Sequence, residues 1–335
     1  MCKRIFAHQT SEQGDVPFYK IGTIGAEPDA YISRELFEDY KAKYNYPREG
    51  EVMVTCAGTV GKTIVFNGDD SYYQDSNIVW LSNPKQLYLN SFLNYYLSRV
   101  NWNKLNSTTI TRIYNDNLRE LIIKYPSVEE QEKIVSLLSL LDQRIAVQNK
   151  VIEKYESLIK ALAYENIGKH TTNKTLSECV RCSSSTIKES DLLDGGTVPT
   201  YGASGISGYM DNALSENDSI LITKDGSGVG YLRYVRGPHS FVGTLNSMTP
   251  NEGVYLPYIY YALQNVCFES YRTGQAIPHI YFKDYGKEAI YCPSFDEQKR
   301  LAKGLKMIDS KVEIERAVLQ YLHSAKAYLL SAMFI

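Results

Sequence analysis

The glycine-rich turn Gly58-Thr-Val-Gly-Lys-Thr63 is the first candidate for chemistry in this chain. It follows a β-rich run, and a loop of this kind with a lysine can bind the phosphates of a nucleotide. The full phosphate-loop pattern requires a glycine five positions before Gly61, where Cys56 stands. A similar turn later in the chain has Tyr231 at the position of Lys62. The sequence therefore predicts a tight glycine turn rather than nucleotide hydrolysis.

Other catalytic and metal-binding patterns are incomplete. Asp29 and the pair Asp39 and Lys41 could hold a divalent metal beside a scissile phosphate, but the pair falls in an expected helix, where charges usually face solvent. Asn83-Pro84-Lys85 lacks the second proline and the aromatic residue of an adenine-methylating site. Cys179-x-x-Cys182 has no second pair of zinc ligands at suitable spacing. We therefore expect no catalytic residue, metal site or cofactor on this chain.

Polar side chains suited to DNA gather in two loops. Arginine can pair with guanine and glutamine with adenine in the major groove, and lysine, serine and threonine contact phosphates. A flexible polar loop without a partner explains the same residues, and chemistry alone does not decide between these interpretations. The candidate DNA-binding residues are Lys20, Lys62, Lys104, Ser107, Thr108, Thr109, Thr111 and Arg112 in the first half, and Lys224, Ser227, Arg272, Thr273, Gln275 and His279 in the second.

An internal repeat organises the elements that must position these residues. Pro126-Ser-Val-Glu-Glu-Gln131 recurs as Pro293-Ser-Phe-Asp-Glu-Gln298, with an offset in the numbering of 293 − 126 = 167. Ile113-Tyr114 recurs as Ile280-Tyr281 at the same offset, whereas the register drifts further back in each copy. A shared frame with a variable interior is the simplest interpretation, so the chain is built twice.

Each copy of the repeated motif begins a long helix, expected over 127–165 and 294–333. Apolar residues follow in alternating steps of four and three, the pattern of a coiled-coil seam. Two helices with one such seam each bury it best on one another, and a pseudo-twofold relation between the copies would make them antiparallel. The seam residues expected to pack are Ile134, Leu138, Leu141, Ile145, Ile152, Leu301, Leu305, Ile308, Val312 and Leu319.

The remaining segments contain short β-rich runs punctuated by turn residues, with a short helix expected near 89–99 and another near 257–271. The predicted fold class is therefore α/β of the α+β kind: two mixed domains, each followed by a long helix, with the helices forming an antiparallel coiled-coil spacer. The predicted boundaries are 1–125 for the first mixed domain, 126–168 for its helix, 169–292 for the second domain and 293–335 for the second helix.

Composition limits the partners. The chain has 36 Lys and Arg against 38 Asp and Glu, a net charge of −2, so a DNA-facing surface must be a local patch rather than a basic domain. Tyrosine is abundant, with 28 residues, and can supply rigid contact area and hydroxyl groups that reach phosphates. No apolar run approaches a membrane span and the first residues lack a signal-peptide core, so we expect a cytoplasmic protein.

These motifs resemble those of the DNA-specificity subunits of type I restriction-modification systems. The resemblance covers nearly the whole chain and rests on 17–23, on the turn at 58–61, on Pro126–Ile134 with 140–142, and on their second copies. It implies two target-recognition domains that each read half of a bipartite double-stranded DNA site, with the helices as a spacer between them. It also implies two modification subunits that use S-adenosylmethionine and two restriction subunits that use ATP and magnesium, with no catalysis on this chain and no contact with a membrane.

Two alternatives remain open: a self-contained nuclease or DNA methyltransferase, and a coiled-coil scaffold that does not touch DNA. The first copy also enters late, because only the segment 1–16 precedes Pro17, whereas the second copy has the longer segment Lys174–Pro199 at the corresponding place. Members of the family usually begin with a strand like the one expected at Leu176–Val180, so we expect either that the first domain lacks this edge strand or that the chain is a truncated or rearranged form.

Overall fold

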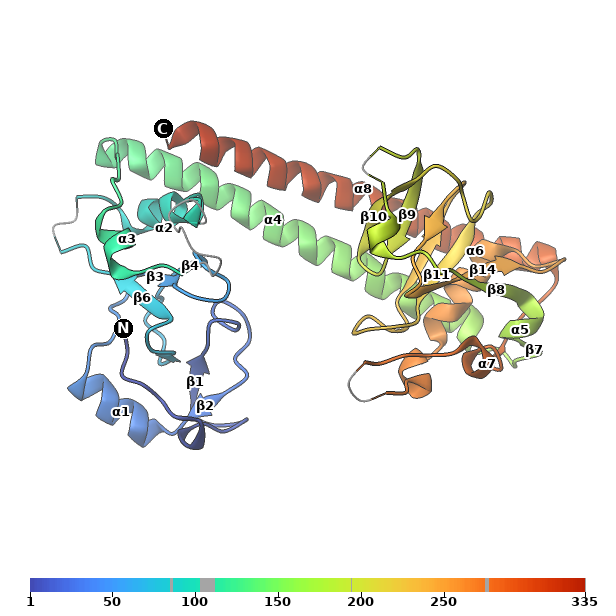
Figure 1. Cartoon of the computed structure of the whole chain (residues 1–335), viewed down its shortest axis with the longest axis horizontal. Coiled ribbons are helices and arrows are strands. Elements are labelled where there is room, and N and C mark those ends of the chain that lie inside the picture. The colour runs from blue at the N-terminus through green and yellow to red at the C-terminus, as the bar shows by residue number, and fades with distance from the viewer. Residues whose placement is uncertain (85–86, 103–111, 194, 275–276, 335) are drawn as a thin grey trace. The chain divides into compact units, whose positions relative to one another are not determined.

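The computed structural model describes residues 1–335 except 85–86, 103–111, 194, 275–276 and 335 (Figure 1). The chain divides into two compact units. Unit 1 consists of Met1–Val147 and Leu319–Ile335, and unit 2 of Gln148–Val318. Each unit therefore contains one mixed α/β domain together with part of both long helices, and the predicted fold class is confirmed.

The two long helices are α4 (Val128–Ala163), with 36 residues, and α8 (Phe295–Met333), with 39 residues. Both begin directly after the repeated motif, where acidic residues in the first turn favour the positive end of the helix dipole. In unit 1 the start of α4 packs on the end of α8, and Leu138 and Leu330 share one core cluster. In unit 2 the second part of α4 packs on the first part of α8, and Arg316 and Glu156 form an ion pair between them at 2.6 Å. The helix segments within each unit are thus antiparallel.

The repeated glutamine fastens each long helix to its domain. Gln131 is fully buried, accepts a hydrogen bond from the Leu89 backbone N–H at 2.7 Å and donates one to the Pro126 carbonyl at 2.9 Å. Gln298 repeats this arrangement in unit 2 with the Tyr255 N–H and the Pro293 carbonyl, both at 2.8 Å. In both units, therefore, the glutamine of the motif bonds to one backbone N–H of the domain and to the carbonyl of the motif's own proline.

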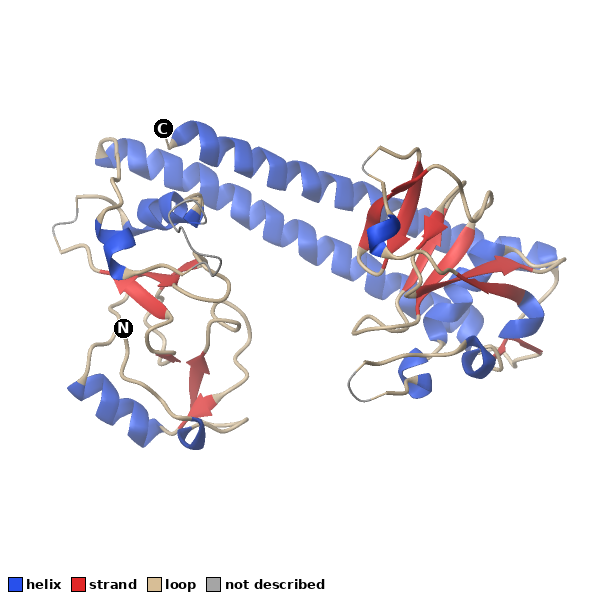
Figure 2. Ribbon diagram, viewed as in Figure 1, coloured by secondary structure: helices blue, strands red, loops and turns tan. Residues whose placement is uncertain are grey.

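The domain of unit 1 contains two three-stranded sheets, with strand orders β2-β1-β5 and β4-β3-β6 (Figure 2). Their interiors form two apolar clusters, one around Phe37 and Tyr72 and one around Phe92 and Leu93. The elements are η1 (Ala7–Gln9), β1 (Val16–Tyr19), β2 (Tyr31–Ile32), α1 (Arg34–Lys43), β3 (Val52–Thr55), β4 (Thr63–Val65), β5 (Tyr72–Tyr73), β6 (Ile78–Leu81), α2 (Asn90–Ser98) and α3 (Asn115–Arg119).

The domain of unit 2 repeats this plan and adds to it. Its sheets have the orders β10-β9-β13, β12-β11-β14-β8 and β15-β7. The elements are η3 (Tyr164–Gly168), β7 (Lys174–Thr175), α5 (Leu176–Cys179), β8 (Val180–Ser184), η4 (Glu189–Asp191), β9 (Val198–Gly202), β10 (Gly205–Met210), β11 (Ser219–Thr223), β12 (Leu232–Val235), β13 (Ser240–Phe241), β14 (Leu245–Pro250), α6 (Leu256–Ala262), η5 (Leu263–Asn265), η6 (Phe268–Tyr271), α7 (Phe282–Tyr285) and β15 (Ala289–Ile290).

Strand pairing shows the correspondence between the units. β1 pairs with β5 in parallel, as β9 pairs with β13, and β3 lies between β4 and β6, as β11 lies between β12 and β14. The prediction of one continuous strand at Leu176–Val180 is wrong, because Leu176–Cys179 forms the helical turn α5 and β8 begins at Val180. The Glu178 carboxylate accepts a hydrogen bond from the Thr175 N–H at 2.7 Å, a capping box that starts a helix.

Among the described residues, no helix is long and apolar enough to cross a membrane.

Candidate nucleic-acid interface

The glycine turn of unit 1 connects β3 to β4. The Gly61 N–H donates to the Thr55 carbonyl at 2.8 Å, and the Lys62 N–H donates to the Thr55 hydroxyl at 3.0 Å. Gly61 has φ +83°, and a Cβ there would lie 2.1 Å from Cδ1 of Trp102. Both the backbone and the aromatic neighbour therefore require glycine. The Lys62 ammonium donates to the Ile24 carbonyl, so in this structure it holds the protein's own backbone.

The glycine turn of unit 2 repeats two backbone hydrogen bonds of unit 1, the one from Gly61 to Thr55 and the one from the Thr55 N–H to the Lys62 carbonyl at 3.0 Å. The Gly230 N–H donates to the Thr223 carbonyl at 2.9 Å, and the Thr223 N–H donates to the Tyr231 carbonyl at 3.0 Å. Gly230 has φ +85°, and a Cβ there would lie 2.6 Å from Cβ of Phe268. Two turns with little sequence identity thus share one backbone shape and one aromatic support, which leaves their outward side chains free to differ.

Backbone hydrogen bonds in unit 2 bring the glycine turn against the segment that leads into α7. The Gly226 N–H donates to the Pro278 carbonyl, and the Ile280 N–H donates to the Lys224 carbonyl, both at 2.9 Å. In unit 1 the Ile113 N–H donates to the Cys56 carbonyl at the same distance. The repeated Ile-Tyr pair therefore lies beside the glycine turn in both copies.

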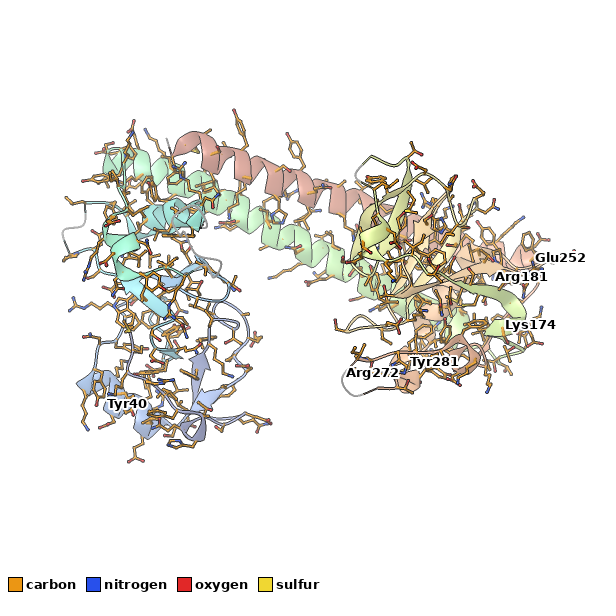
Figure 3. All side chains as sticks on the ribbon, in the orientation of Figure 1. Tyr40, Lys174, Arg181, Glu252, Arg272 and Tyr281 are labelled. Atoms are coloured by element: carbon orange, nitrogen blue, oxygen red, sulfur yellow. The ribbon has the colours of Figure 1, made fainter. Side chains whose placement is uncertain are left out.

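Five of the predicted residues of unit 2 can be placed in this turn-and-loop region. Thr273 and His279 exchange two backbone hydrogen bonds at 2.9 Å, and Lys224 and Ser227 belong to the adjoining turn, with Ser227 exposed. Arg272 forms an ion pair with Glu269 at 2.6 Å, and Figure 3 shows its side chain at the same edge of the unit as Tyr281. Gln275 lies outside the described residues.

Three of the predicted residues of unit 1 can be placed. Arg112 lies next to the anchored Ile113 and donates to the Ser76 carbonyl at 3.4 Å. Lys20 forms an ion pair with Asp29 at 3.1 Å, and Lys62 is held as described above. The predicted residues outside the described part of the chain are Lys104, Ser107, Thr108, Thr109 and Thr111.

Sequence reasoning missed a cation held by aromatic rings in unit 2. The Arg233 guanidinium lies 5.7 Å from the Tyr201 ring centroid and 5.5 Å from that of the exposed Tyr231. Arg233 also donates to the Gly202 carbonyl at 3.4 Å. This stacking fixes the orientation of a planar donor group close to the glycine turn. Tyr231 and Arg233 lie two positions apart around β12, so the alternation of a strand could have revealed them.

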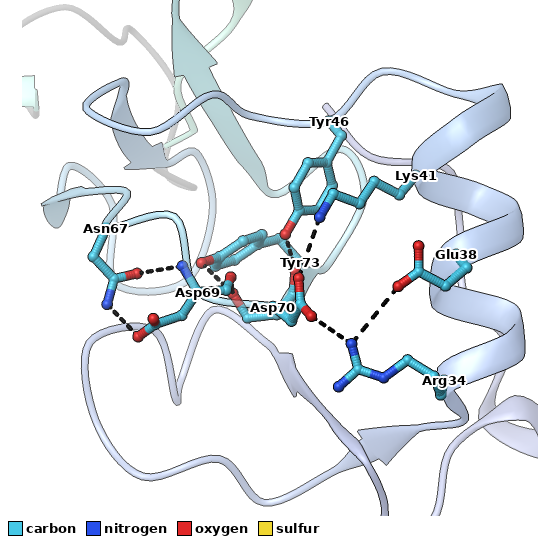
Figure 4. Close-up of polar contacts among 9 residues, drawn as sticks. Arg34, Glu38, Lys41, Tyr46, Asn67, Asp69, Asp70 and Tyr73 are labelled. Carbon is cyan, nitrogen blue, oxygen red and sulfur yellow. Dashed lines mark hydrogen bonds and ion pairs between the residues drawn. The ribbon is translucent and has the colours of Figure 1, made fainter.

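The residues considered for a nuclease site, Asp29, Asp39 and Lys41, are each paired with another charged residue: Asp29 with Lys20, Lys41 with Asp70 and Asp39 with Lys43. Asp70 accepts from Arg34 and from Lys41, the latter at 3.2 Å, and Asp39 pairs with Lys43 (Figure 4). Hydrogen bonding to the Arg34 guanidinium lowers the pKa of Asp70. Within the described parts of the chain, no group of three or more His, Cys, Asp or Glu could hold a metal ion. The same contacts tie α1 to the loop before β5, so these charges have a structural explanation.

The predicted helix seam lies on the covered faces of α4 and α8. Leu138, Ile152, Leu305 and Val312 are buried, and the other six predicted seam residues are half-buried. Near one end of the seam, the Tyr95 hydroxyl donates to Asp142 at 2.8 Å; its counterpart in unit 2, Tyr261, donates to Asp309 at 3.3 Å. Each domain is thus joined to the long helices by a tyrosine as well as by the repeated glutamine.

Comparisons with known proteins agree with this architecture. The family model described as "Type I restriction modification DNA specificity domain" matches residues 1–157 and 172–323. A putative type I restriction enzyme specificity subunit of Haemophilus influenzae is 51% identical over 138 residues, which cover 41% of this chain and 36% of that protein. The chain therefore matches little more than a third of this relative's length.

Two solved structures have a similar fold. The crystal structure of the type I restriction-modification S subunit from M. genitalium matches with a TM-score of 0.58 and 22% identity, covering 100% of this chain and 92% of that one. A structure that describes complex assembly and conformational transition of the type I R-M system matches with a TM-score of 0.51 and 16% identity, covering 95% of this chain and 90% of that one. At these identities the likeness concerns the fold alone.

Proposed function

The chain belongs to the type I restriction modification DNA specificity family, and from this premise we propose that it recognises a bipartite double-stranded DNA target. The observation that carries the proposal is the repeated turn-and-loop arrangement. Both units hold the repeated isoleucine, Ile113 or Ile280, beside a glycine turn through the same backbone hydrogen bond, while the polar sequences that precede it differ. Two recognition domains with the same scaffold and different polar residues suit a DNA site whose two halves differ in sequence.

The chemistry of the loops suits DNA despite the net charge of −2. Arg112, Arg272 and the ring-held Arg233 can pair with guanine, and the hydroxyls of Ser227 and Thr273 can reach phosphates. Affinity for the phosphate backbone grows with the number of cations in contact, and each unit offers few. We therefore expect part of the phosphate contact to come from partner subunits.

Exposed apolar side chains on α8 support docking of such partners. Tyr321 is 75% exposed in unit 1, and Tyr328 is exposed one heptad further along the same helix. In unit 2, Met307 and Ile314 are exposed with the same heptad spacing. Residues one heptad apart share one helix face, and exposed apolar stripes mark interaction sites. We assign this face to the modification subunits; two of them, with two restriction subunits, are the stoichiometry that the family resemblance implies.

In this proposal the chain supplies specificity and no catalysis. S-adenosylmethionine, ATP and magnesium then act on the partner subunits. Incubating the purified chain alone with DNA, magnesium and S-adenosylmethionine tests the competing nuclease or methyltransferase hypothesis. We expect neither cleavage nor methyl transfer, and either product would overturn the assignment.

The central test measures DNA preference with the modification subunit present, on the cognate site and on a scrambled site. The cognate site comes from sequencing the methylated positions in cells that carry the complete system. A bidentate arginine–guanine pair contributes about 1–3 kcal/mol of discrimination, so Arg112→Ala or Arg272→Ala should lower the preference about tenfold. Each change should relax one half of the target. Arg119→Ala and Arg300→Ala, at exposed arginines outside the loops, are the matched controls.

Three outcomes would each count against one part of this proposal. Unchanged preference in both loop variants would reject the loop residues. Equal binding of cognate and scrambled DNA by the wild-type complex would favour the scaffold hypothesis. Inserting one heptad within 140–155 and one within 307–322 should lengthen the unspecified gap of the target, and an unchanged gap would reject the helices as a spacer.

A further inference from the structure

In unit 1 a lysine neutralises an aspartate between the long helices. Lys326 of α8 forms an ion pair with Asp142 of α4, and the side chain of Lys326 is only 25% exposed. Its ammonium lies 5.6 Å from the ring centroid of Tyr95, whose hydroxyl donates to the same carboxylate. The face of an aromatic ring attracts cations. Unit 1 therefore holds an ammonium group between a carboxylate and an aromatic ring.

The counterpart aspartate of unit 2 lacks this lysine. At the repeat offset of 167, Asp142 corresponds to Asp309 (142 + 167) and Lys326 corresponds to Ile159 (326 − 167). Isoleucine is shorter than lysine and carries no charge. Within the described parts of the chain, Asp309 accepts a hydrogen bond from Tyr261 at 3.3 Å and forms no ion pair. Unit 2 therefore keeps the carboxylate of this arrangement and lacks its cation.

A cavity of about 350 Å³ lies beside Asp309, and all of its lining residues belong to unit 2. Ile159 also lines it, so the cavity borders the position that the Lys326 ammonium occupies in unit 1. Its aromatic lining consists of Tyr231, Tyr260 and Phe268. One carboxylate among aromatic rings suits an organic cation with an apolar stem. A divalent metal ion would need several oxygen ligands instead.

The other charged groups around Asp309 do not neutralise it. Lys160 lines the cavity but is exposed, so water and salt screen its charge. The arginines that act on Asp309 are bound to other carboxylates, in the ion pairs Arg316–Glu156 at 2.6 Å and Arg236–Glu313 at 3.5 Å. Despite these arginines, burial raises the pKa of the Asp309 carboxyl. A cation that enters the cavity would therefore meet a carboxylate without a direct ionic partner.

We propose that unit 2 binds a primary ammonium group on a flexible alkyl chain in this cavity, which we call the amine site: Asp309, Ile159, Tyr231 and Tyr260. The ammonium would pair with the Asp309 carboxylate, as the lysine does in unit 1, and the alkyl chain would pack on Ile159 and the aromatic rings. A free polyamine and a lysine side chain of a partner polypeptide share this chemistry. The proposal rests on the contacts of unit 2 and does not depend on DNA reading.

Isothermal titration calorimetry of the full chain with n-butylammonium chloride tests the proposal. This probe has the alkyl length and the charge of a lysine side chain. Salt at about 0.15 M screens binding to exposed surface charges. We expect saturable binding of one n-butylammonium ion per chain. Butan-1-ol, the neutral analogue, should bind about tenfold more weakly or less, because it cannot form the charge-assisted hydrogen bond to the carboxylate.

Substitutions locate the bound ion. Asp309→Asn should weaken n-butylammonium binding about tenfold or more, because it removes the charge and keeps the shape. Asp142→Asn, the same change in unit 1, is the matched control and should leave binding unchanged. Ile159→Lys gives unit 2 the lysine of unit 1 and should abolish binding, whereas Ile159→Leu should retain it. Ile159 is buried, so the melting temperature should fall less for Ile159→Lys in the wild-type background than for Ile159→Lys combined with Asp309→Asn.

Two further probes distinguish the sources of the ammonium group. Spermidine represents a free polyamine, and Nα-acetyl-lysine methylamide represents a lysine side chain of a partner polypeptide. The probe that binds more tightly assigns the amine site to its source. Absence of n-butylammonium binding, equal binding of n-butylammonium and butan-1-ol, or equal n-butylammonium binding by the wild-type chain and Asp309→Asn would overturn the proposal. Undiminished binding by a folded Ile159→Lys chain would overturn it as well.

Discussion

The Gln148 side-chain amide donates a hydrogen bond to the Glu315 carbonyl at 3.1 Å, and these two residues occupy the same position in the two copies of the repeat (315 − 148 = 167). Gln148 is buried, and its amide also donates to the Glu315 carboxylate. The apolar seams of α4 and α8 would tolerate sliding by a heptad, whereas a buried polar pair fits one register only. The contact therefore selects how the helix segments of unit 2 align.

Replacing Gln148 tests this role in alignment. Gln148→Ala removes the buried amide that donates to Glu315, while the ion pair between Glu315 and Lys311 remains, so the free energy of unfolding should fall by about 1–3 kcal/mol. Denaturant unfolding of the purified chain measures the change. Asn149→Ala, at the exposed neighbouring position, is the control and should lie within about 0.5 kcal/mol of wild type. Equal stability of the two variants would show that the seam alone sets the register.

The repeated glutamine at the start of α4 makes a second prediction. Gln131→Leu keeps the volume similar but removes the partners of the Leu89 N–H and the Pro126 carbonyl, and unit 1 should lose about 2–4 kcal/mol. Gln131→Glu should recover part of this loss, because a carboxylate can accept from Leu89 but cannot donate to Pro126. Hydrogen exchange, followed separately for the amides of unit 1 and of unit 2, measures the loss of stability in each unit. Equal protection of the two variants would contradict the acceptor role of residue 131.

The glycine turn of unit 2 offers a matched pair of substitutions. Gly230→Ala combines an unfavourable φ of +85° with a contact at 2.6 Å to Phe268, and we expect a loss of about 2–5 kcal/mol. Gly228→Ala, in the same turn, would place its Cβ 3.8 Å from Thr223 and should be tolerated. Thermal unfolding of both variants provides the comparison. Similar melting temperatures would mean that the turn can move away from Phe268.

The long helices and their seams were predictable because they depend on local periodicity. The steps of four and three set the covered face, and the structure buries or half-buries every residue from Ile134 to Leu319 that the pattern selected. The short helix expected near 257–271 fails for a local reason. α6 ends at Ala262, and Val266 has extended backbone angles, which break the segment into η5 and η6.

The contacts that join distant segments could not be read from the sequence. The Gln131 side chain bonds to the Leu89 backbone in the segment before α2, and Arg233 of β12 stacks on Tyr201 of β9. The sequence separation of the residues in each pair matches neither the period of a helix nor that of a strand. The motif around Gln131 was recognised as a helix start, but its reason, a buried N–H that needs an acceptor, is visible only in the folded chain. The DNA-binding residues stay a prediction.

Two counterpart aspartates, Asp309 and Asp142, make the last prediction, because their contacts differ. Asp309 accepts a hydrogen bond from Tyr261 at 3.3 Å, and burial raises the pKa of its carboxyl. A raised folded-state pKa means that the charged form opposes folding. The free-energy cost that the charged carboxylate adds to folding is absent below the unfolded-state pKa of about 3.9. It grows as the pH rises through the folded-state pKa and reaches its full value above it. Asp309→Asn should therefore raise the melting temperature at pH 7, with a difference that disappears near pH 3.

Asp142→Asn, the same change at the counterpart position, should have the opposite effect. Asp142 forms an ion pair with Lys326 and accepts from Tyr95, so its loss should cost about 0.5–1 kcal/mol at pH 7. Melting temperatures of both variants between pH 3 and pH 8 measure the two effects side by side. A lower melting temperature of Asp309→Asn at pH 7 would show that the neighbouring arginines, Arg236 and Arg316, outweigh the burial of this carboxylate.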